Sequence, residues 1–296
     1  MIAVLMGGYS AEREISLLSG NAVYEALLKS NVDCFSFDLT HENIESLWEK
    51  EFDKAFIILH GRGGEDGYIQ SQLIKKGIPF TGSNAIASNL CMNKATTKDL
   101  WSNHSLPLSP SIVAIKGQNL DSINFPLPWA VKPTLEGSSI GISKVKNQNE
   151  LDDALKAAWH YNDEALIEQW VEGDEYTVAI LNNKTLPSIK IISDHDIYDY
   201  HSKYFSNKTE YLCPSGLTIA QEKNIQMIAL KAFNLTGASG WGRVDFMRYD
   251  NEIPKVLEIN TVPGMTEKSL VPMAAKQLGI NFPDLCWRIL ETSFDN

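Results

Sequence analysis

The chain has 296 residues, 44% of them hydrophobic, which is enough apolar material for two or three lobes with their own cores. Acidic residues outnumber basic ones by 37 to 26, a formal net charge of −11, so no basic footprint for nucleic acid runs across the chain. The four cysteines are scattered and the first apolar run is too short for a signal peptide or a membrane span, so we expect a cytoplasmic protein with a small substrate and no membrane partner.

The first ninety residues alternate strands with helices. We expect strands at 2–6, 32–37, 55–59 and 78–81, and helices at 15–29 and 68–76. This alternation predicts an open, Rossmann-like parallel sheet. Ligands of such sheets bind outside the carboxyl ends of the strands, so the Gly7-Gly8 and His60-Gly61 loops should face one pocket.

A different pattern begins near residue 93. A helix to about 104, strands at 111–114 and 129–131 and a helix at 151–159 predict a small middle lobe. Further strands are expected at 165–168, 176–181 and 188–192, followed by helices at 221–235 and near the C-terminus with apolar stripes. The lobes are therefore predicted as residues 1–90, 91–165 and 166–296, with an aromatic-rich lid at about 194–214.

Two segments near the C-terminus predict an antiparallel hairpin. Residues 240–248 and 255–260 both alternate, and residues 249–252 can form the turn between them. In that pairing Asp245 lies roughly opposite Glu258, while Leu257 points to the other, apolar face.

The two facing carboxylates are a candidate metal site. Like charges directly across a ladder destabilise it, so a cation between them is a physical reason for the arrangement. The oxygen donors of Asp245, Glu258 and Asn260 suit Mg²⁺, with ATP phosphates and water completing the shell. The alternative is a hairpin whose polar face is merely solvated, and the spacing leaves both interpretations open.

Lysines and glycines in the middle of the chain indicate phosphate binding. Lys132 ends a strand before a glycine-rich turn whose backbone N–H groups can approach an anion, although the lysine precedes the glycines, unlike in a Walker A loop. Lys94 and Lys203 are further candidates, and Glu168 and Glu175 could meet ribose, an adenine edge or a metal. Solvated surface charges and turn residues would explain each of them equally well.

Taken in order along the chain, these segments resemble the ATP-grasp superfamily and, within it, the D-alanine--D-alanine ligase family. The matching stretches are 7–16, 60–67, 132–141, 198–204, 240–245, 258–266 and 269–273. The resemblance implies a mixed α/β and α+β fold, in which the N-terminal lobe is followed by a two-lobed ATP-grasp fold with antiparallel sheets. It also implies that ATP phosphorylates one D-alanine and that a second D-alanine attacks the acyl phosphate. The products would be ADP, phosphate and D-alanyl-D-alanine for peptidoglycan precursor synthesis.

The resemblance assigns the nucleotide and metal sites. Nucleotide-binding residues would be Lys94, Lys132, Glu168, Gln169, Trp170, Val171, Glu175 and Lys203, the last reaching the terminal phosphate. Magnesium, or manganese in its place, would be held by Asp245, Glu258 and Asn260.

The amino-acid sites follow from the same resemblance. Glu12 would bind the ammonium group of the first substrate, and His60 its carboxylate or the acyl phosphate. Arg243 and the Gly264 N–H would stabilise the oxyanion. A hydrogen-bonded group of Ser138 and Tyr204 with Glu12 would order the first substrate, while Ser269 and the Leu270 N–H would bind the second carboxylate.

Two other functions remain as alternatives. A D-alanine--D-lactate ligase or another carboxylate–amine ligase would use the same ATP chemistry with a different second nucleophile, although Tyr204 favours the dipeptide. A non-catalytic nucleotide or amino-acid sensor would bind without releasing ADP. Relatives of this kind are commonly dimers, so a homodimer is a candidate assembly.

Overall fold

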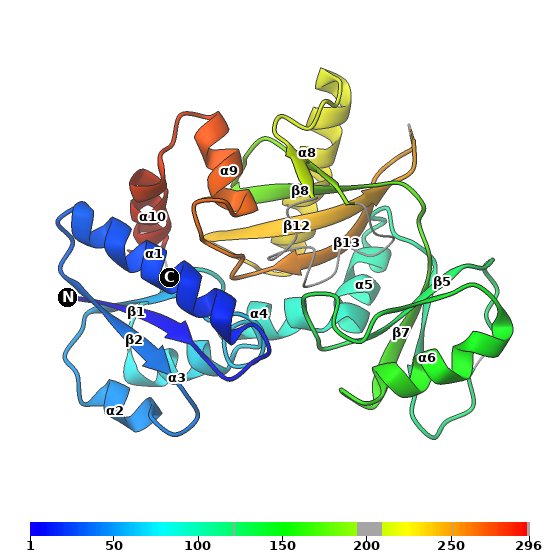
Figure 1. The fold of residues 1–296 in the computed structure, drawn as a ribbon, viewed down its shortest axis with the longest axis horizontal. Coiled ribbons are helices and arrows are strands. Elements are labelled where there is room, and N and C mark those ends of the chain that lie inside the picture. The colour runs from blue at the N-terminus through cyan, green and yellow to red at the C-terminus, as the bar shows by residue number, and fades with distance from the viewer. Residues whose placement is uncertain (121, 194–208, 251, 295–296) are drawn as a thin grey trace.

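The computed structural model describes residues 1–120, 122–193, 209–250 and 252–294. Figure 1 shows three groups of elements side by side, with the N-terminal strands on the left, α8 and its sheet in the centre, and β5, β7 and α6 on the right. None of the helices in the described part of the chain is long and apolar enough to cross a membrane.

The N-terminal group is built on a three-stranded parallel sheet in the order β2-β1-β3, as predicted. Its strands are β1 (Ile2–Gly7), β2 (Cys34–Leu39) and β3 (Lys54–Ile57), and its helices are α1 (Arg13–Lys29), α2 (Ile44–Trp48) and α3 (Tyr68–Lys76). The short α2 was not predicted. The strand expected at 78–81 is reduced to a single bridge between Ala55 and Phe80.

Two consecutive helices lead out of this group. They are α4 (Ala85–Met92), which was not predicted, and α5 (Lys94–Asn103). Asn93 begins α5, because its side-chain oxygen accepts hydrogen bonds from the N–H groups of Ala95 and Thr96. Lys94 is therefore held in the first turn of the helix, and Trp101, fully buried at the other end, donates its indole N–H to Ala232.

The second group is a four-stranded antiparallel sheet in the order β4-β7-β5-β6. Its strands are β4 (Ser111–Ile115), β5 (Trp129–Pro133), β6 (Ser143–Val145) and β7 (Glu164–Gln169), and the 3₁₀ turn η1 (Gln148–Glu150) precedes α6 (Leu151–Ala158). Val131 and Ile167 on one face pack against Leu155 of α6. Because both partners of β7 belong to this sheet, the predicted lobe boundary at residue 166 falls inside a strand, and the division into lobes stays a prediction.

The third group is a six-stranded sheet in the order β11-β10-β8-β12-β13, with β9 paired to β8. Its elements are β8 (Asp174–Leu181), β9 (Lys184–Thr185), β10 (Ile189–Ile192), β11 (Glu210–Leu212), α8 (Ile219–Leu235), β12 (Trp241–Arg248) and β13 (Lys255–Asn260). The predicted apolar stripe of α8 is buried against one face of the sheet. The opposite face of this sheet lines a cavity.

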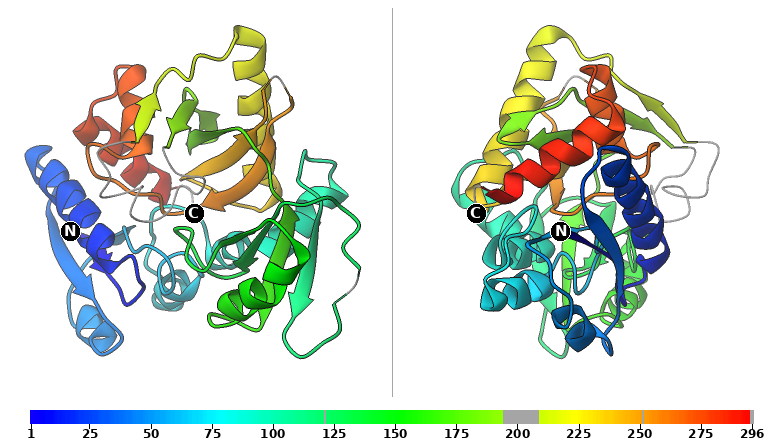
Figure 2. Two further views of the ribbon diagram at one scale, coloured as in Figure 1. Left: turned by 45° about the vertical axis from the view of Figure 1, so that its right-hand side comes forward. Right: turned by 90° about the vertical axis from the view of Figure 1, so that its left-hand side faces the viewer.

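The chain ends beside its beginning. Helices α9 (Leu270–Gln277) and α10 (Phe282–Glu291), followed by the 3₁₀ turn η2 (Thr292–Phe294), share a hydrophobic core with the N-terminal sheet. Figure 2 shows α10 lying against α1, which agrees with their contacts. The N-terminal loops are thereby brought to the edge of the third group.

The predicted hairpin is confirmed, with one departure. Asp245 is the register partner of Glu258, but the register then shifts by one residue, so that Phe246 pairs with Val256. This β-bulge turns Leu257 toward the cavity that Glu258 also lines, so the prediction that Leu257 lies on the apolar face was wrong.

Candidate active site

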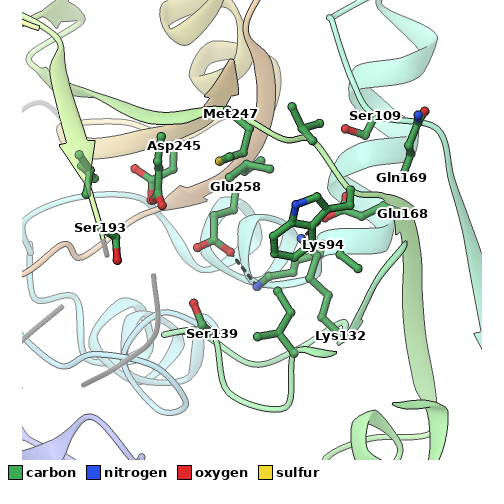
Figure 3. Close-up of a pocket in the computed structure, with 18 of the residues that line it drawn as sticks. Lys94, Ser109, Lys132, Ser139, Glu168, Gln169, Ser193, Asp245, Met247 and Glu258 are labelled. Atoms are coloured by element: carbon green, nitrogen blue, oxygen red, sulfur yellow. Dashed lines mark ion pairs between the residues drawn. The ribbon is translucent and has the colours of Figure 1, made fainter. Parts of the chain in front are cut away.

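A cavity lies between the two antiparallel sheets, and strands from both sheets line it. The central sheet contributes Ala130, Lys132, Glu168 and Gln169, whereas the six-stranded sheet contributes Glu175, Ile191, Asp245, Met247, Leu257 and Glu258. Figure 3 shows the lysines of the central sheet and α5 on one side, with Asp245 and Glu258 across from them. Lysines and carboxylates thus both line the cavity, and some of them are in direct contact.

One end of the cavity is built around the buried carboxylate of Glu168. Lys132 on the neighbouring strand forms an ion pair with it, and Lys98 Nζ lies 2.6 Å from its other oxygen. Burial alone would raise the pKa of Glu168, but the two ammonium groups outweigh burial and hold this pKa at about 2. Glu168 is therefore an ionised group that can only accept hydrogen bonds.

Lys98, the buried partner of Glu168, was missed by sequence reasoning. It lies four residues after Lys94 on α5, and residues four apart share one face of a helix. This spacing was the available signal, because a predicted phosphate-binding lysine at 94 already placed that face toward the ligand.

Trp170 and Val171 follow directly after β7 and line the same end of the cavity, as does Gln169. The ammonium group of Lys144 lies 4.4 Å from the centre of the Trp170 ring and pairs with Glu172 at 3.0 Å. A cation held on one face fixes the indole, so the ring is a rigid part of the cavity wall.

At the other end, Asp245 is 2% exposed and accepts four hydrogen bonds. Arg243 donates two, at 2.8 and 2.6 Å, Thr177 donates one at 2.6 Å, and Asn260 Nδ2 donates one at 2.9 Å. This hydrogen bond fixes the orientation of the Asn260 amide, so its carbonyl oxygen is left as a possible metal ligand. Arg243 is therefore the counter-ion of Asp245.

Glu258 is neutralised by a different cation. Its carboxylate lies 3.0 Å from Lys94 Nζ, as the dashed line in Figure 3 shows, and the same ammonium donates to the Glu136 carbonyl at 2.6 Å. The described residues contain no group of three or more His, Cys, Asp or Glu side chains arranged for a metal. Two carboxylates and one amide oxygen nevertheless fit an ion that takes its remaining ligands from phosphate and water, as Mg²⁺ does.

The glycine-rich turn after Lys132 joins the cavity to the N-terminal loops. Ser138 and Ser139 both have positive φ, 50° and 59°, a conformation that non-glycine residues rarely adopt and that is common at ligand-binding turns. Ser138 donates a short hydrogen bond to the buried Glu12 carboxylate. Two residues that the family resemblance placed together are therefore in contact.

Arg62 makes a second connection between the N-terminal loops and the glycine-rich turn. Arg62 lies 2.6 Å from the carboxylate of Glu136 and donates to the Tyr161 carbonyl at 3.2 Å. The Arg62–Glu136 ion pair thus ties the His60 loop to the glycine-rich turn.

His60 is buried and its tautomer follows from its partners. Nδ1 lies 2.7 Å from the Val262 carbonyl, so Nδ1 carries the proton, and Nε2 lies 3.4 Å from Ser19 Oγ. Burial lowers the pKa of His60, against the pull of the Glu12 carboxylate, so the ring is neutral at pH 7 in this state. The predicted convergence of the Gly7-Gly8 and His60-Gly61 loops is confirmed by the hydrogen bond from Ser10 Oγ to the His60 carbonyl at 2.7 Å.

Glu65 also escaped sequence reasoning. Its two oxygens accept from the backbone N–H groups of Gly61 at 2.8 Å and Val262 at 3.0 Å, so it ties the N-terminal loop to the loop after β13. Burial raises the pKa of Glu65 to about 8, and the nearby Glu12 carboxylate adds to the increase. Its place in the His60–Gly67 motif was the available signal.

The loop before α9 forms the remaining predicted subsite. Ser269 is the N-cap of α9, yet its hydroxyl does not cap that helix and instead accepts from Thr266 N at 3.0 Å. A Cβ on Gly264 would lie 3.3 Å from this hydroxyl, so the Gly264 backbone and Ser269 are neighbours. Leu270 begins α9, where the N–H groups of the first turn have no partner within the helix. Lys203 and Tyr204 lie outside the described residues.

A cavity between two antiparallel sheets, with lysines on one side and paired carboxylates on the other, defines the class: this is an ATP-grasp enzyme. The family model for the C-terminal part of D-ala D-ala ligases matches residues 110–291. The chain belongs to the D-alanine--D-alanine ligase family.

Individual relatives agree with that assignment. The D-alanine--D-alanine ligase of Vesicomyosocius okutanii is 62% identical over 98% of this chain and 99% of its own length, and that of Alkalilimnicola ehrlichii is 50% identical over 98% and 93%. A Bacillus anthracis D-alanine--D-alanine ligase structure complexed with ATP superposes with a TM-score of 0.87 at 30% identity, covering 99% of this chain and 97% of the other. The predicted family and fold are confirmed.

Proposed function

We propose that this chain ligates two D-alanine molecules at the expense of ATP, through a D-alanyl phosphate. One observation carries the proposal beyond family membership: the hydrogen bond between Ser138 and Glu12 joins the glycine-rich turn beside the nucleotide cavity to the N-terminal loop that carries the proposed amino-acid ligand. Near relatives named D-alanine--D-alanine ligases support the choice of substrate. The dipeptide product is a precursor of peptidoglycan.

The first half of the reaction transfers phosphate. Glu12 binds the ammonium group of the first D-alanine. One carboxylate oxygen of this D-alanine attacks the γ-phosphorus of ATP. The bond from that phosphorus to the bridging oxygen breaks and ADP leaves. Lys94 and Lys132 hold the phosphates, with Lys203 proposed at the terminal one, because catalysis of phosphoryl transfer is mainly positioning and charge stabilisation.

Asp245, Glu258 and the Asn260 carbonyl oxygen would hold Mg²⁺, or Mn²⁺ in its place. The bound ion would offset the charge of the phosphates. In the structure described, Arg243 and Lys94 neutralise these two carboxylates, whose charge the ion would offset when bound. Glu175 lines the same cavity and is proposed as a ribose contact.

The base of ATP is proposed to lie at the Glu168 end. Gln169, Trp170 and Val171 form the wall there, and the Glu168 carboxylate can accept a hydrogen bond from the purine amino group. Lys132 lines the cavity beside Glu168, so it is proposed to contact the phosphates from this end.

The second half forms the peptide bond. The amine of the second D-alanine attacks the acyl carbon, the bond to the phosphate oxygen breaks, and phosphate and one proton are released. Arg243 and the Gly264 N–H stabilise the negative charge on the carbonyl oxygen. Ser269 and the N–H of Leu270 bind the carboxylate of the second substrate, where the first turn of α9 offers free donors.

His60 and Tyr204 complete the proposed set. His60 can contact the substrate carboxylate only when Nε2 is protonated, and a bound anion favours that form by raising the pKa of the ring. Tyr204 is proposed to join Ser138 and Glu12 in ordering the first substrate. The enzyme is proposed to act in the cytoplasm, as a homodimer.

Product analysis tests the second nucleophile. With ATP and Mg²⁺, the purified chain should release ADP and form D-alanyl-D-alanine from D-alanine alone, and added D-lactate should not divert the product. Exclusive formation of the ester would replace the proposal with a D-alanine--D-lactate ligase. Nucleotide binding without any ADP release would indicate a sensor.

A further inference from the structure

Lys98 is placed behind the nucleotide cavity rather than in it. Its side chain is 4% exposed and that of Glu168 is 5% exposed, and the two charged groups lie 2.6 Å apart. Glu168 and Lys132 line the cavity, whereas Lys98 does not. Lys98 therefore reaches the nucleotide site only through Glu168.

The cluster holds one more positive charge than its single carboxylate requires. Lys132 alone would balance Glu168, and burying an additional ammonium group is costly unless it is paired. Burial accordingly lowers the pKa of Lys98, while the Glu168 carboxylate acts in the opposite direction and favours the charged ammonium. Lys132 faces the cavity, so a bound nucleotide competes for its ammonium group. Lys98 has Glu168 as its only acidic partner among the residues that the structure describes.

We propose that Lys98 is a positioning residue that holds Glu168 as a fixed, charged hydrogen-bond acceptor and so makes the site selective for a 6-amino purine over a 6-oxo purine. The amino group of adenine can donate to this carboxylate. The oxygen of hypoxanthine would face it acceptor to acceptor, and neither group could supply a proton.

The electrostatics agree with this geometry. A protonated Glu168 could donate to a 6-oxo group and would abolish the distinction between the bases. The two lysines hold the pKa of Glu168 at about 2, so the protonated form is absent at neutral pH. When Lys132 turns to the nucleotide, Lys98 still holds the charge and orientation of the carboxylate.

The inference rests on the proposed nucleotide site, and its test uses binding alone, so it does not depend on ligation. Equilibrium titration of the full chain with ADP and with IDP, which differ only at the 6-position region of the base, measures the preference directly. We expect wild type to bind ADP about 100-fold more tightly than IDP, since an unpaired buried acceptor is strongly unfavourable.

The informative variant is Lys98→Met. It leaves Lys132 and Glu168 as a neutral pair, so the fold should survive. We expect this variant to bind ADP about tenfold more weakly than wild type, because the carboxylate loses a charged partner. Its preference for ADP over IDP should decrease from about 100-fold to about tenfold. Lys98→Arg should restore most of the preference, and Lys156→Met, which removes an exposed ion pair with Asp153, should leave it unchanged.

A second variant keeps the test decisive if Lys98→Met does not fold. Glu168→Gln offers both a donor and an acceptor to the base and should also reduce the preference for ADP. A folded Lys98→Met variant with the wild-type preference would overturn the inference, as would a Glu168→Gln variant with that preference. A wild-type chain that binds ADP but does not convert ATP to ADP in the presence of D-alanine would instead count against the proposed function.

Discussion

Two buried carboxylates, Asp245 and Glu168, show how single residues are prepared for a highly charged substrate. Asp245 accepts four hydrogen bonds, and Glu168 lies between two lysines. A buried charge is costly unless it is paired and hydrogen-bonded, and both carboxylates meet that condition without a ligand. The proposed site is therefore organised without a ligand, and ATP would compete for the cations that pair with these two carboxylates.

Glu258→Gln tests the proposed metal site. The substitution keeps the size of the side chain and its place opposite Asp245 but removes one negative charge from the donor set. We expect Mg²⁺-dependent ADP release to fall about 100-fold or more, the usual loss when a group that stabilises transition-state charge is removed. Asp153→Asn is the control, because this carboxylate is 86% exposed and does not line the cavity, and the variant should keep its rate. A Glu258→Gln variant with wild-type kinetics would remove this residue from the metal site.

The ionisation of Glu168 predicts how stability depends on pH. Its pKa falls from 4.5 to about 2 on folding, so the unfolded chain takes up the proton first as the pH drops. Its contribution to the free energy of unfolding is fully present above about pH 5 and is lost as the pH falls toward 2. Denaturant titrations of wild type and Glu168→Gln between pH 6 and pH 3 should therefore converge on acidification.

Glu65 provides a control of the opposite sign. Its pKa is raised from 4.5 to about 8, so its contribution weakens as the pH rises through that interval. Glu65→Gln should therefore gain stability relative to wild type from pH 5 to pH 8. Parallel titration curves for wild type and both variants would contradict these electrostatic assignments.

At the scale of single elements, α5 supports the proposed nucleotide site. Lys94 points to Glu258 and Lys98 to Glu168, so one helix contacts both ends of the cavity. The helix is held by its Asn93 cap and by Trp101, which is fully buried and donates to the Ala232 carbonyl of α8. Small movements of α5 would shift both lysines together.

Trp101→Phe tests this support. The change removes one buried hydrogen bond and part of the indole volume, and we expect a loss of about 2 kcal/mol in the free energy of unfolding. Because α5 carries both lysines, the KM for ATP should also rise by a few fold. Trp287→Phe is the matched control, since Trp287 is 43% exposed and should change neither quantity. An unchanged KM in a destabilised Trp101→Phe variant would show that α5 only contributes to the core.

Element-scale features also show how far the sequence predicts this structure. The alternation of apolar and polar residues predicted that Asp245 lies opposite Glu258, because side chains alternate between the two faces of a strand and this alternation specifies the register. It could not predict the bulge that turns Leu257 to the cavity, because one inserted residue alters the faces without altering the composition. Local signals pointed to Lys98, on the Lys94 face of its helix, and to Glu65, in the His60–Gly67 motif. Their partners, Glu168 and Val262, are distant in the sequence, so local spacing could not identify these contacts.

For the whole molecule, the decisive feature is that the N-terminal loops meet both ATP-grasp sheets. Glu12 contacts Ser138, Arg62 contacts Glu136, and His60 contacts Val262, so all three groups of elements enclose one site. The return of α10 to α1 holds the first and third groups together (Figure 2). Such an arrangement can keep water from a reactive acyl phosphate, which a cavity within one sheet layer could not do.

The most direct test of the ligase account follows one oxygen atom. If the carboxylate of the first D-alanine attacks ATP, D-alanine labelled with ¹⁸O in its carboxylate must pass one labelled oxygen to the released phosphate. Mass spectrometry of the phosphate after turnover with ATP and Mg²⁺ should therefore detect one ¹⁸O per D-alanyl-D-alanine formed. Unlabelled phosphate released together with the dipeptide would contradict the acyl phosphate mechanism.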